Sequence, residues 1–375
     1  MSLDKLLEKF AAVANNPNAY LVDWKERTGK VAIGGIAPFP PEEIIYAAGA
    51  LPVTMWGADI EPNDAYKFYP AFYCSVVTTV TQLALQGSYR ELAAVVCNCC
   101  CDSLNDLMEN WKSAIDIPII ECVYPQNRKI EPAKYYMVKD LRLCAEKVEK
   151  ITEHKITDLD LQHTIHLFNA HRQAMREFSL VAGDHLDVIT PLVRRNVFKS
   201  AHFMDKAEHL EWVRALIEAL KKRPVYLFDG VRVVSTGIMI DSTELMNLLE
   251  KNKIGIVGDD VVAESKRYEV DVNNGIDLYY QLADRWSRME GCSLLYDPSK
   301  KRGTMLAEMA KQRSADGVLV CLLKFCEMEE YDYPILRKVF KKAELPELFL
   351  EVEATTGNDE QAGTRIQAFC EMLGK

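Results

Sequence analysis

Short apolar runs alternate with amphipathic stretches along the first 130 residues of the chain. The helical patterns lie at residues 4–15 and 40–50 and directly after Cys74 and Cys101. The apolar runs have the length of buried strands and lie at residues 29–38, 51–57, 93–99 and 117–123. Strands that alternate with helices predict a mostly parallel sheet covered on both faces.

The same rhythm returns near the C-terminus after a long stretch of helical patterns. Apolar runs typical of strands lie at residues 224–230, 253–260, 317–323 and 347–353. Helical patterns at 241–252 and 360–373 accompany them. We therefore predict an N-terminal α/β lobe at 1–130, a helical connector at 131–222 and a C-terminal α/β lobe at 223–375.

The two outer segments correspond to each other in the order of their elements. AAVVCNCCCD, a helix and IPIIECV in the first match DGVLVCLLKFCE, a helix and LPELFLEVE in the second. The pattern predicts an α/β fold of two similar Rossmann-like lobes with parallel sheets. Ligands of such sheets bind at the carboxyl ends of the strands. Cys101 and Cys326 both follow a strand end, so they would meet in the cleft if the lobes face each other.

Composition narrows the class of protein. The net charge is −10 and both signs are interspersed, which argues against nucleic-acid binding. No apolar run of about 18 residues predicts a membrane span. The N-terminus mixes charges into its first turns, unlike a secretory signal, so we expect a cytoplasmic protein. Eleven cysteines in such a chain argue against a disulfide framework.

Three of the cysteines stand at predicted loop or helix-start positions, namely Cys74, Cys101 and Cys326. The exposed amides and the dipole at a helix start favour the thiolate, which is the form that binds metal. Cys100 remains an alternative to Cys101, because the register of the CNCCCD run is open. The other cysteines fall in strand or helix patterns and are interpreted as packing residues: Cys97, Cys99, Cys122, Cys144, Cys292, Cys321 and Cys370.

An all-thiolate set favours an iron–sulfur cluster over zinc. The seven histidines all lie in the helical connector, and no pair of CxxC motifs is present. Three thiols would leave one iron of a four-iron cluster without a protein ligand. The sequence also has no P-loop motif, no GxGxxG and no GxSxG.

At these residues the chain resembles the small, or beta, subunits of the 2-hydroxyacyl-CoA dehydratases, a family that includes benzoyl-CoA reductase subunits. The resemblance covers essentially the whole chain. The segments that carry it are PPEEIIYAAGALPV, YPAFYCS, CCCDS, DGVLVCLLKFCEMEEYDYP, LFLEVE and GTRIQAFCEML.

The resemblance implies one oxygen-sensitive [4Fe–4S] cluster held by Cys74, Cys101 and Cys326, serving electron transfer. It implies a homologous alpha subunit as heterodimer partner and an ATP-dependent iron–sulfur activator protein. The implied reaction removes water from an acyl-CoA, such as (R)-2-hydroxyisocaproyl-CoA, through a ketyl radical, mainly at the alpha subunit. Glu43 matches an acidic position of the family, although a helix-start carboxylate explains it at least as well as a catalytic role.

Three other interpretations stay open from sequence alone. The first is a homodimeric reductase of the same broad family with a double-cubane cluster. The second is a non-redox protein with structural zinc. The third is a binding module in which the cysteines only fill the core.

Overall fold

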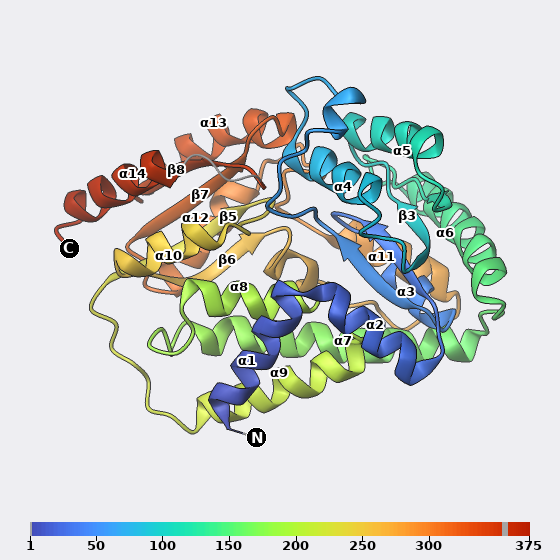
Figure 1. Cartoon of the computed structure of the whole chain (residues 1–375). Helices are drawn as coiled ribbons and strands as arrows, with labels where there is room; N and C mark the ends of the chain where they lie inside the picture. The colour runs from blue at the N-terminus through green and yellow to red at the C-terminus, as the bar shows by residue number, and fades with distance from the viewer. Residues whose placement is uncertain (1, 355–358) are drawn as a thin grey trace.

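The computed structural model describes residues 2–354 and 359–375, which form two sheets surrounded by helices (Figure 1). Each sheet has four strands, and every pair of neighbouring strands is parallel. The α/β fold with two Rossmann-like lobes is therefore confirmed. The order of strands is β2-β1-β3-β4 in the first sheet and β6-β5-β7-β8 in the second.

The strand order is the same in both lobes, so corresponding strands end at corresponding places. The first sheet consists of β1 (Ala32–Ile36), β2 (Leu51–Met55), β3 (Leu92–Cys97) and β4 (Ile119–Glu121). The second consists of β5 (Val231–Gly237), β6 (Ile254–Val261), β7 (Gly317–Leu323) and β8 (Glu347–Val352). In each sheet the chain reverses its winding direction beside the first strand, and such a switch point is where parallel sheets bind ligands.

Helices cover the sheets and fill the space between the lobes (Figure 1). The N-terminal part of the chain forms α1 (Leu3–Asn15), α2 (Pro17–Thr28), α3 (Glu42–Ala47), α4 (Ser75–Leu85) and α5 (Asp102–Ala114), with a 3₁₀ turn at Ala65–Lys67. Four helices follow: α6 (Glu131–Thr152), α7 (Asp158–Ala182), α8 (Pro191–Ser200) and α9 (Lys206–Lys221). The remaining helices are α10 (Thr243–Lys251), α11 (Leu278–Arg288), α12 (Arg302–Gln312), α13 (Glu327–Lys342) and α14 (Asp359–Met372), with a 3₁₀ turn at Ser265–Tyr268.

The prediction of a strand at residues 224–230 is wrong. Residues 224–230 form an extended connection rather than a strand, and β5 begins only at Val231. The connection runs along the outside of the molecule between α9 and β5 (Figure 1). Leu227 is 90% exposed, whereas Val233 and Val234 of β5 are fully buried. Both segments are apolar, and burial decides which of them pairs with the sheet.

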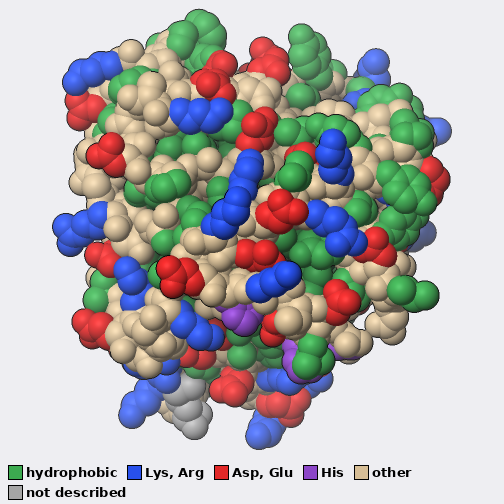
Figure 2. All heavy atoms as spheres, turned by 90° about the vertical axis from the view of Figure 1, so that its right-hand side faces the viewer, with side chains coloured by type: hydrophobic (Ala, Val, Ile, Leu, Met, Phe, Trp, Pro, Cys, Tyr) green, Lys and Arg blue, Asp and Glu red, His purple; other side chains and the backbone are tan. Residues whose placement is uncertain are grey.

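The surface carries both signs of charge. Figure 2 shows acidic and basic side chains interspersed over the face that includes α5 and α6. Ion pairs such as Lys112–Glu109 and Lys129–Glu290 join them. Among the described residues, no helix is long and apolar enough to cross a membrane.

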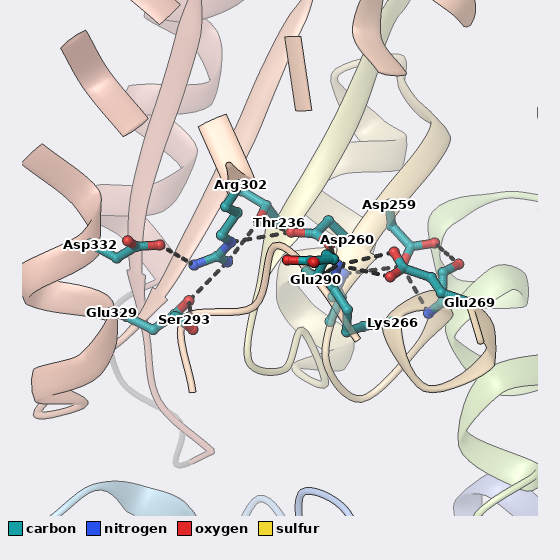
Figure 3. Close-up of polar contacts among 12 residues, drawn as sticks. Thr236, Asp259, Asp260, Lys266, Glu269, Glu290, Ser293, Arg302, Glu329 and Asp332 are labelled. Atoms are coloured by element: carbon teal, nitrogen blue, oxygen red, sulfur yellow. Dashed lines mark hydrogen bonds and ion pairs between the residues drawn. The ribbon is translucent and has the colours of Figure 1, made fainter. Parts of the chain in front are cut away.

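A buried arginine ties together the carboxyl end of the second sheet (Figure 3). Arg302, at the start of α12, is 4% exposed. Its guanidinium donates to Thr236 of β5 at 2.8 Å and to Asp260 of β6 at 3.1 Å. It also donates to Glu329 at 3.0 Å and Asp332 at 3.3 Å, both on α13. One side chain therefore fixes α13 relative to two strands.

A lysine extends this network on the other side of β6 (Figure 3). Lys266 is fully buried and lies 2.5 Å from Asp260 and 3.0 Å from Glu269. It also donates to the backbone carbonyl of Glu290 at 3.0 Å. The buried carboxylate of Asp260 thus has two cationic partners, which compensates for its removal from water.

We expect the Arg302→Met substitution to lower the free energy of unfolding by about 3–5 kcal/mol, because three buried carboxylates lose their shared cation. Arg337→Met is the matched control. Arg337 lies on α13 with its side chain 70% exposed and pairs with Glu347 at 3.1 Å. Its loss should change stability by less than about 1 kcal/mol. Urea denaturation measures both, and equal effects would show that Arg302 does not organise this end of the sheet.

A glycine allows the segment after β2 to approach α4. Gly57 has φ +84°, and a Cβ there would lie 2.0 Å from Thr79 Oγ1. Gly29 has φ +67°, but a Cβ there would have no neighbouring atom within 4 Å. We therefore expect Gly29→Ala to cost about 1 kcal/mol from backbone strain alone. Gly57→Ala should cost a further 1–3 kcal/mol or so from overpacking. Denaturation midpoints of the two variants measure the difference in stability between them. Equal midpoints would show that α4 can move away from a Cβ at position 57.

Candidate functional site

Three cysteines occupy equivalent positions, each directly before a helix. Cys74 is the N-cap residue of α4, Cys101 of α5 and Cys326 of α13. Cys101 follows β3 and Cys326 follows β7, and these are corresponding strands of the two sheets. The helices α4, α5 and α13 all lie in the upper part of the molecule as drawn in Figure 1.

The structure brings the three thiols together from the two lobes. Burial and, to a lesser extent, the nearby Cys101 thiol raise the pKa of Cys74 to about 11. Burial raises the pKa of Cys326 well above its ordinary value, with contributions from Glu329, Cys74 and Cys101. All three residues are half-buried and pack against the same apolar core.

A tight turn presents Cys326. The backbone N–H of Cys326 donates to the carbonyl of Leu323 at 3.0 Å, and Phe325 between them has φ +61°. Glu329 holds this turn, because its carboxylate accepts from the backbone N–H of Leu323 at 3.4 Å and from the Ser293 hydroxyl at 3.3 Å. The same carboxylate also accepts a hydrogen bond from the guanidinium of Arg302 (Figure 3). The position of Cys326 therefore depends on the buried network of the second lobe.

A hydrogen bond joins the lobes beside Cys74. The buried hydroxyl of Ser75 accepts from the backbone N–H of Ala354 at 2.8 Å. Ser75 begins α4 in the first lobe, and Ala354 follows β8 in the second. This bond fixes the start of α4 against the second lobe.

Cys100 and Cys101 are the two candidates for the ligand that follows β3, and their surroundings differ. Cys101 is half-buried, and its pKa is lowered mainly by a hydrogen bond from the Cys100 thiol and also by the backbone N–H groups of Leu104 and Ser103. Cys100 is 3% exposed, and its pKa is raised because its thiol is the donor to Cys101 and because it is buried. The thiolate that acts on both Cys74 and Cys326 is that of Cys101.

Most of the remaining cysteines are buried in the core, and Cys97 and Cys99 lie near enough to Cys101 to affect each other's pKa. Cys99 is half-buried with its sulfur 3.8 Å from that of Met108. The Cys122 and Cys144 thiols are hydrogen-bonded to each other. The fully or nearly fully buried cysteines are Cys97, Cys122, Cys144, Cys292, Cys321 and Cys370.

The donor set fits a multi-iron cluster better than a single ion. Within residues 2–354 and 359–375, no three His, Cys, Asp or Glu side chains are close enough together to hold one metal ion. Each thiolate of an iron–sulfur cluster can bind a different iron atom, which spreads the ligands apart. Cys74, Cys101 and Cys326 at three separate helix starts fit that arrangement.

Glu43 lies in the first turn of α3 and is 5% exposed. Its carboxylate forms an ion pair with Arg172 of α7, which is also buried. Glu43 therefore joins the first lobe to the helical layer. It also lines a buried cavity beneath α3, which lies apart from the three cysteines.

Sequence patterns alone do not indicate several residues that shape this region. Arg302 and Ser293 stand in no recognisable motif, and Ser75 ends the segment YPAFYCS without any signal of its contact with the second lobe. Glu329 has a local signal, because it follows Cys326 at the cap-x-x-Glu spacing of a capping box. Its carboxylate binds the backbone N–H of Leu323 rather than that of the cap residue.

Comparison with known families agrees with the fold and with the segments that surround the cysteines. Residues 38–373 match the family described as 2-hydroxyglutaryl-CoA dehydratase, D-component. This match includes all three helix-start cysteines and every strand except β1.

Similar proteins carry names that refer to several acyl-CoA substrates. The chain is 41% identical to the (R)-phenyllactyl-CoA dehydratase beta subunit of Clostridium sporogenes over 99% of both chains. It is 38% identical to the lactoyl-CoA dehydratase beta subunit of Anaerotignum propionicum, again over 99% of both. It is 32% identical to the (R)-2-hydroxyglutaryl-CoA dehydratase beta subunit of Acidaminococcus fermentans over the full length of both. The chain therefore belongs to the 2-hydroxyacyl-CoA dehydratase family, and within it to the beta subunits.

Proposed function

We propose that this beta subunit holds one [4Fe–4S] cluster on Cys74, Cys101 and Cys326 and relays single electrons within a dehydratase. The observation that supports the proposal is that three half-buried cysteines from two lobes, each at the start of a helix, affect one another's pKa. The cluster would supply one-electron transfer when bound.

The helix starts make this end of the molecule suitable for a negatively charged group. Cys74, Cys101 and Cys326 each stand at the N-terminal end of a helix, where the helix dipole is positive. Thiolates and a cluster carry negative charge, so the three helices favour both. The half-burial of the thiols limits access of water, which further shapes the potential of such a group.

The reaction that we propose for the assembled enzyme is the removal of the 2-hydroxyl group from an acyl-CoA. An electron added to the thioester would give a ketyl radical that expels the hydroxyl, after which the proton on the neighbouring carbon is lost more easily and the electron is recovered. The partners would be a homologous alpha subunit and an ATP-dependent activator. The term beta subunit in the names of the relatives supports the first, and the missing P-loop supports an external energy source.

Exposed apolar side chains beside two of the cysteines support a partner protein at this end. Phe72, two residues before Cys74, is 65% exposed, and Tyr331 on α13 is 78% exposed. Isolated apolar side chains are common on surfaces, but these flank the proposed cluster site. We assign this face to contact with the alpha subunit.

For the substrate we propose an uncharged acyl side chain, with (R)-2-hydroxyisocaproyl-CoA in first place. The two relatives named for phenyllactyl-CoA and lactoyl-CoA are 41% and 38% identical, and both substrates carry uncharged side chains. The relative named for 2-hydroxyglutaryl-CoA, which carries a carboxylate, is 32% identical.

We expect Cys326→Ser to abolish dehydration and to remove most of the iron and sulfide from the beta subunit, because a hydroxyl is a poor ligand for iron. The measurement is iron and sulfide analysis with visible and EPR spectra of the complex, co-expressed anaerobically with the alpha subunit. Cys370→Ser is the control, since the Cys370 thiol contacts the backbone carbonyl of Asn252 and its pKa is raised by burial alone. Full iron content in the Cys326 variant would overturn the assignment.

The same analysis separates the two middle candidates. Cys101→Ser should lose the cluster, whereas Cys100→Ser should keep it, because only Cys101 caps α5. The reverse result would make Cys100 the ligand. An iron content well above four per beta chain would instead favour the double-cubane reductase, and zinc without visible absorption would favour a structural metal site.

We expect the assembled, activated enzyme to dehydrate 2-hydroxyisocaproyl-CoA with a kcat/KM at least about tenfold higher than 2-hydroxyglutaryl-CoA, because burying an unpaired carboxylate in an apolar pocket is unfavourable. Initial rates with the isocaproyl, phenyllactyl, lactyl and glutaryl thioesters measure the order. A preference for the glutaryl thioester would contradict the proposed substrate class.

A further inference from the structure

A buried cavity lies between the start of α3 and the helices α7 and α11, apart from the three cysteines. Its volume is about 60 Å³, which is room for roughly four water-sized groups. The charged side chains that line it are Glu42, Glu43, Arg172, Lys206, Arg267 and Arg285.

Positive charge exceeds negative charge in this lining. Glu42 lies 2.9 Å from Arg267 and 3.4 Å from Lys206, and Glu43 pairs with Arg172. Four basic groups therefore face two carboxylates. His171 also lines the cavity, but burial lowers its pKa well below the ordinary value, so it adds no charge at neutral pH.

Arg285 is the basic group of this lining that makes no direct ion pair among the described residues. Its guanidinium donates to the backbone carbonyls of Val270 and Arg267, both at 2.8 Å. Among the described residues it takes part in no ion pair within 4.0 Å. Burial and the nearby positive charge of Arg267 lower the pKa of Arg285 to about 10, although the more distant carboxylates of Glu42 and Asp271 act in the opposite direction.

The neighbouring Trp286 has an unused hydrogen-bond donor. It is 5% exposed, and its indole Nε1–H is buried without a partner in the described residues. Its ring packs edge-on against Phe39 and Tyr124, at centroid distances of 5.3 and 4.9 Å. A buried N–H without an acceptor is unfavourable, so an acceptor in this cavity would stabilise it.

Apart from His171 and the hydroxyl groups of Tyr124 and Tyr268, the rest of the lining is apolar. Phe39, Phe168 and Leu282 form part of the wall, and each is at most 8% exposed. A water molecule could accept from Trp286 but would not balance the excess positive charge. A small ligand with a negatively charged, hydrogen-bond-accepting head and a short apolar tail would fit this cavity. Its head would balance the excess positive charge and accept from Trp286 Nε1–H, and its tail would contact the apolar side chains.

We propose that this cavity is a binding site for a small carboxylate of the size of acetate or propionate. The carboxylate lies by Arg285 and Trp286, and the alkyl group contacts the apolar wall. No cysteine lines this cavity. The test of carboxylate binding is therefore independent of the proposed cluster and of the dehydratase function.

Calorimetric titration of the anaerobic alpha–beta complex with sodium acetate and sodium propionate, in a chloride background, tests the site. We expect saturable binding to the wild type, and at least about tenfold weaker binding to the variants Arg285→Met and Trp286→Phe. Arg288→Met is the matched control. Arg288 lies on the same helix, does not line the cavity, and pairs with Asp284 at 2.7 Å, which also pairs with Lys134. This control should bind as the wild type does.

Thermal unfolding of the same proteins gives a second measurement, since a ligand of the native state raises the melting temperature. Propionate should raise it in the wild type and the Arg288 variant but not in the Arg285 variant. Absence of saturable binding in the wild type, or unchanged binding in the Arg285 variant, would overturn the proposal. Binding of phosphate without binding of either carboxylate would overturn the assignment to carboxylates.

Discussion

The guanidinium of Arg302 is the interaction on which the geometry of the second lobe depends. It reaches two strands and two positions on α13 at once, and each contact is buried. Burying a charge is favourable only when its partners are fixed around it, so the network leaves α13 little freedom to move. Cys326 is the residue directly before that helix. Its position therefore depends on the carboxylates that bind Arg302, although none of them forms a hydrogen bond with its thiol. Glu329 connects the two, since it contacts both Arg302 and the turn before Cys326.

The identical strand order in the two sheets has a structural consequence beyond symmetry. It places the ends of β3 and β7 at corresponding points, so two helix starts of similar construction face a common region. The third thiol comes from α4, which is held against the other lobe by the bond between Ser75 and Ala354. Electron transfer through such a site would tolerate little relative movement of the lobes, and this bond is well placed to limit it.

Local patterns predicted most of the fold because burial on both faces makes the parallel strands continuously apolar. Seven of the eight strands were recognisable in this way. The segment around Leu227 shows where the method fails, since an exposed apolar connection has the same composition as a buried strand. The candidate cysteines were predictable because a helix start is a local feature of the sequence. Arg302 could not be found, because its partners are distant in the chain and only the folded sheet brings them together.

The separation of the three thiols along the chain also bears on how the protein is made. During synthesis the N-terminal lobe emerges first and can fold first, with Cys74 and Cys101 already in place. Cys326 is added near the end of translation, and the set is complete only when the second lobe has folded against the first. Any group held by all three thiols would therefore bind only after the second lobe has folded.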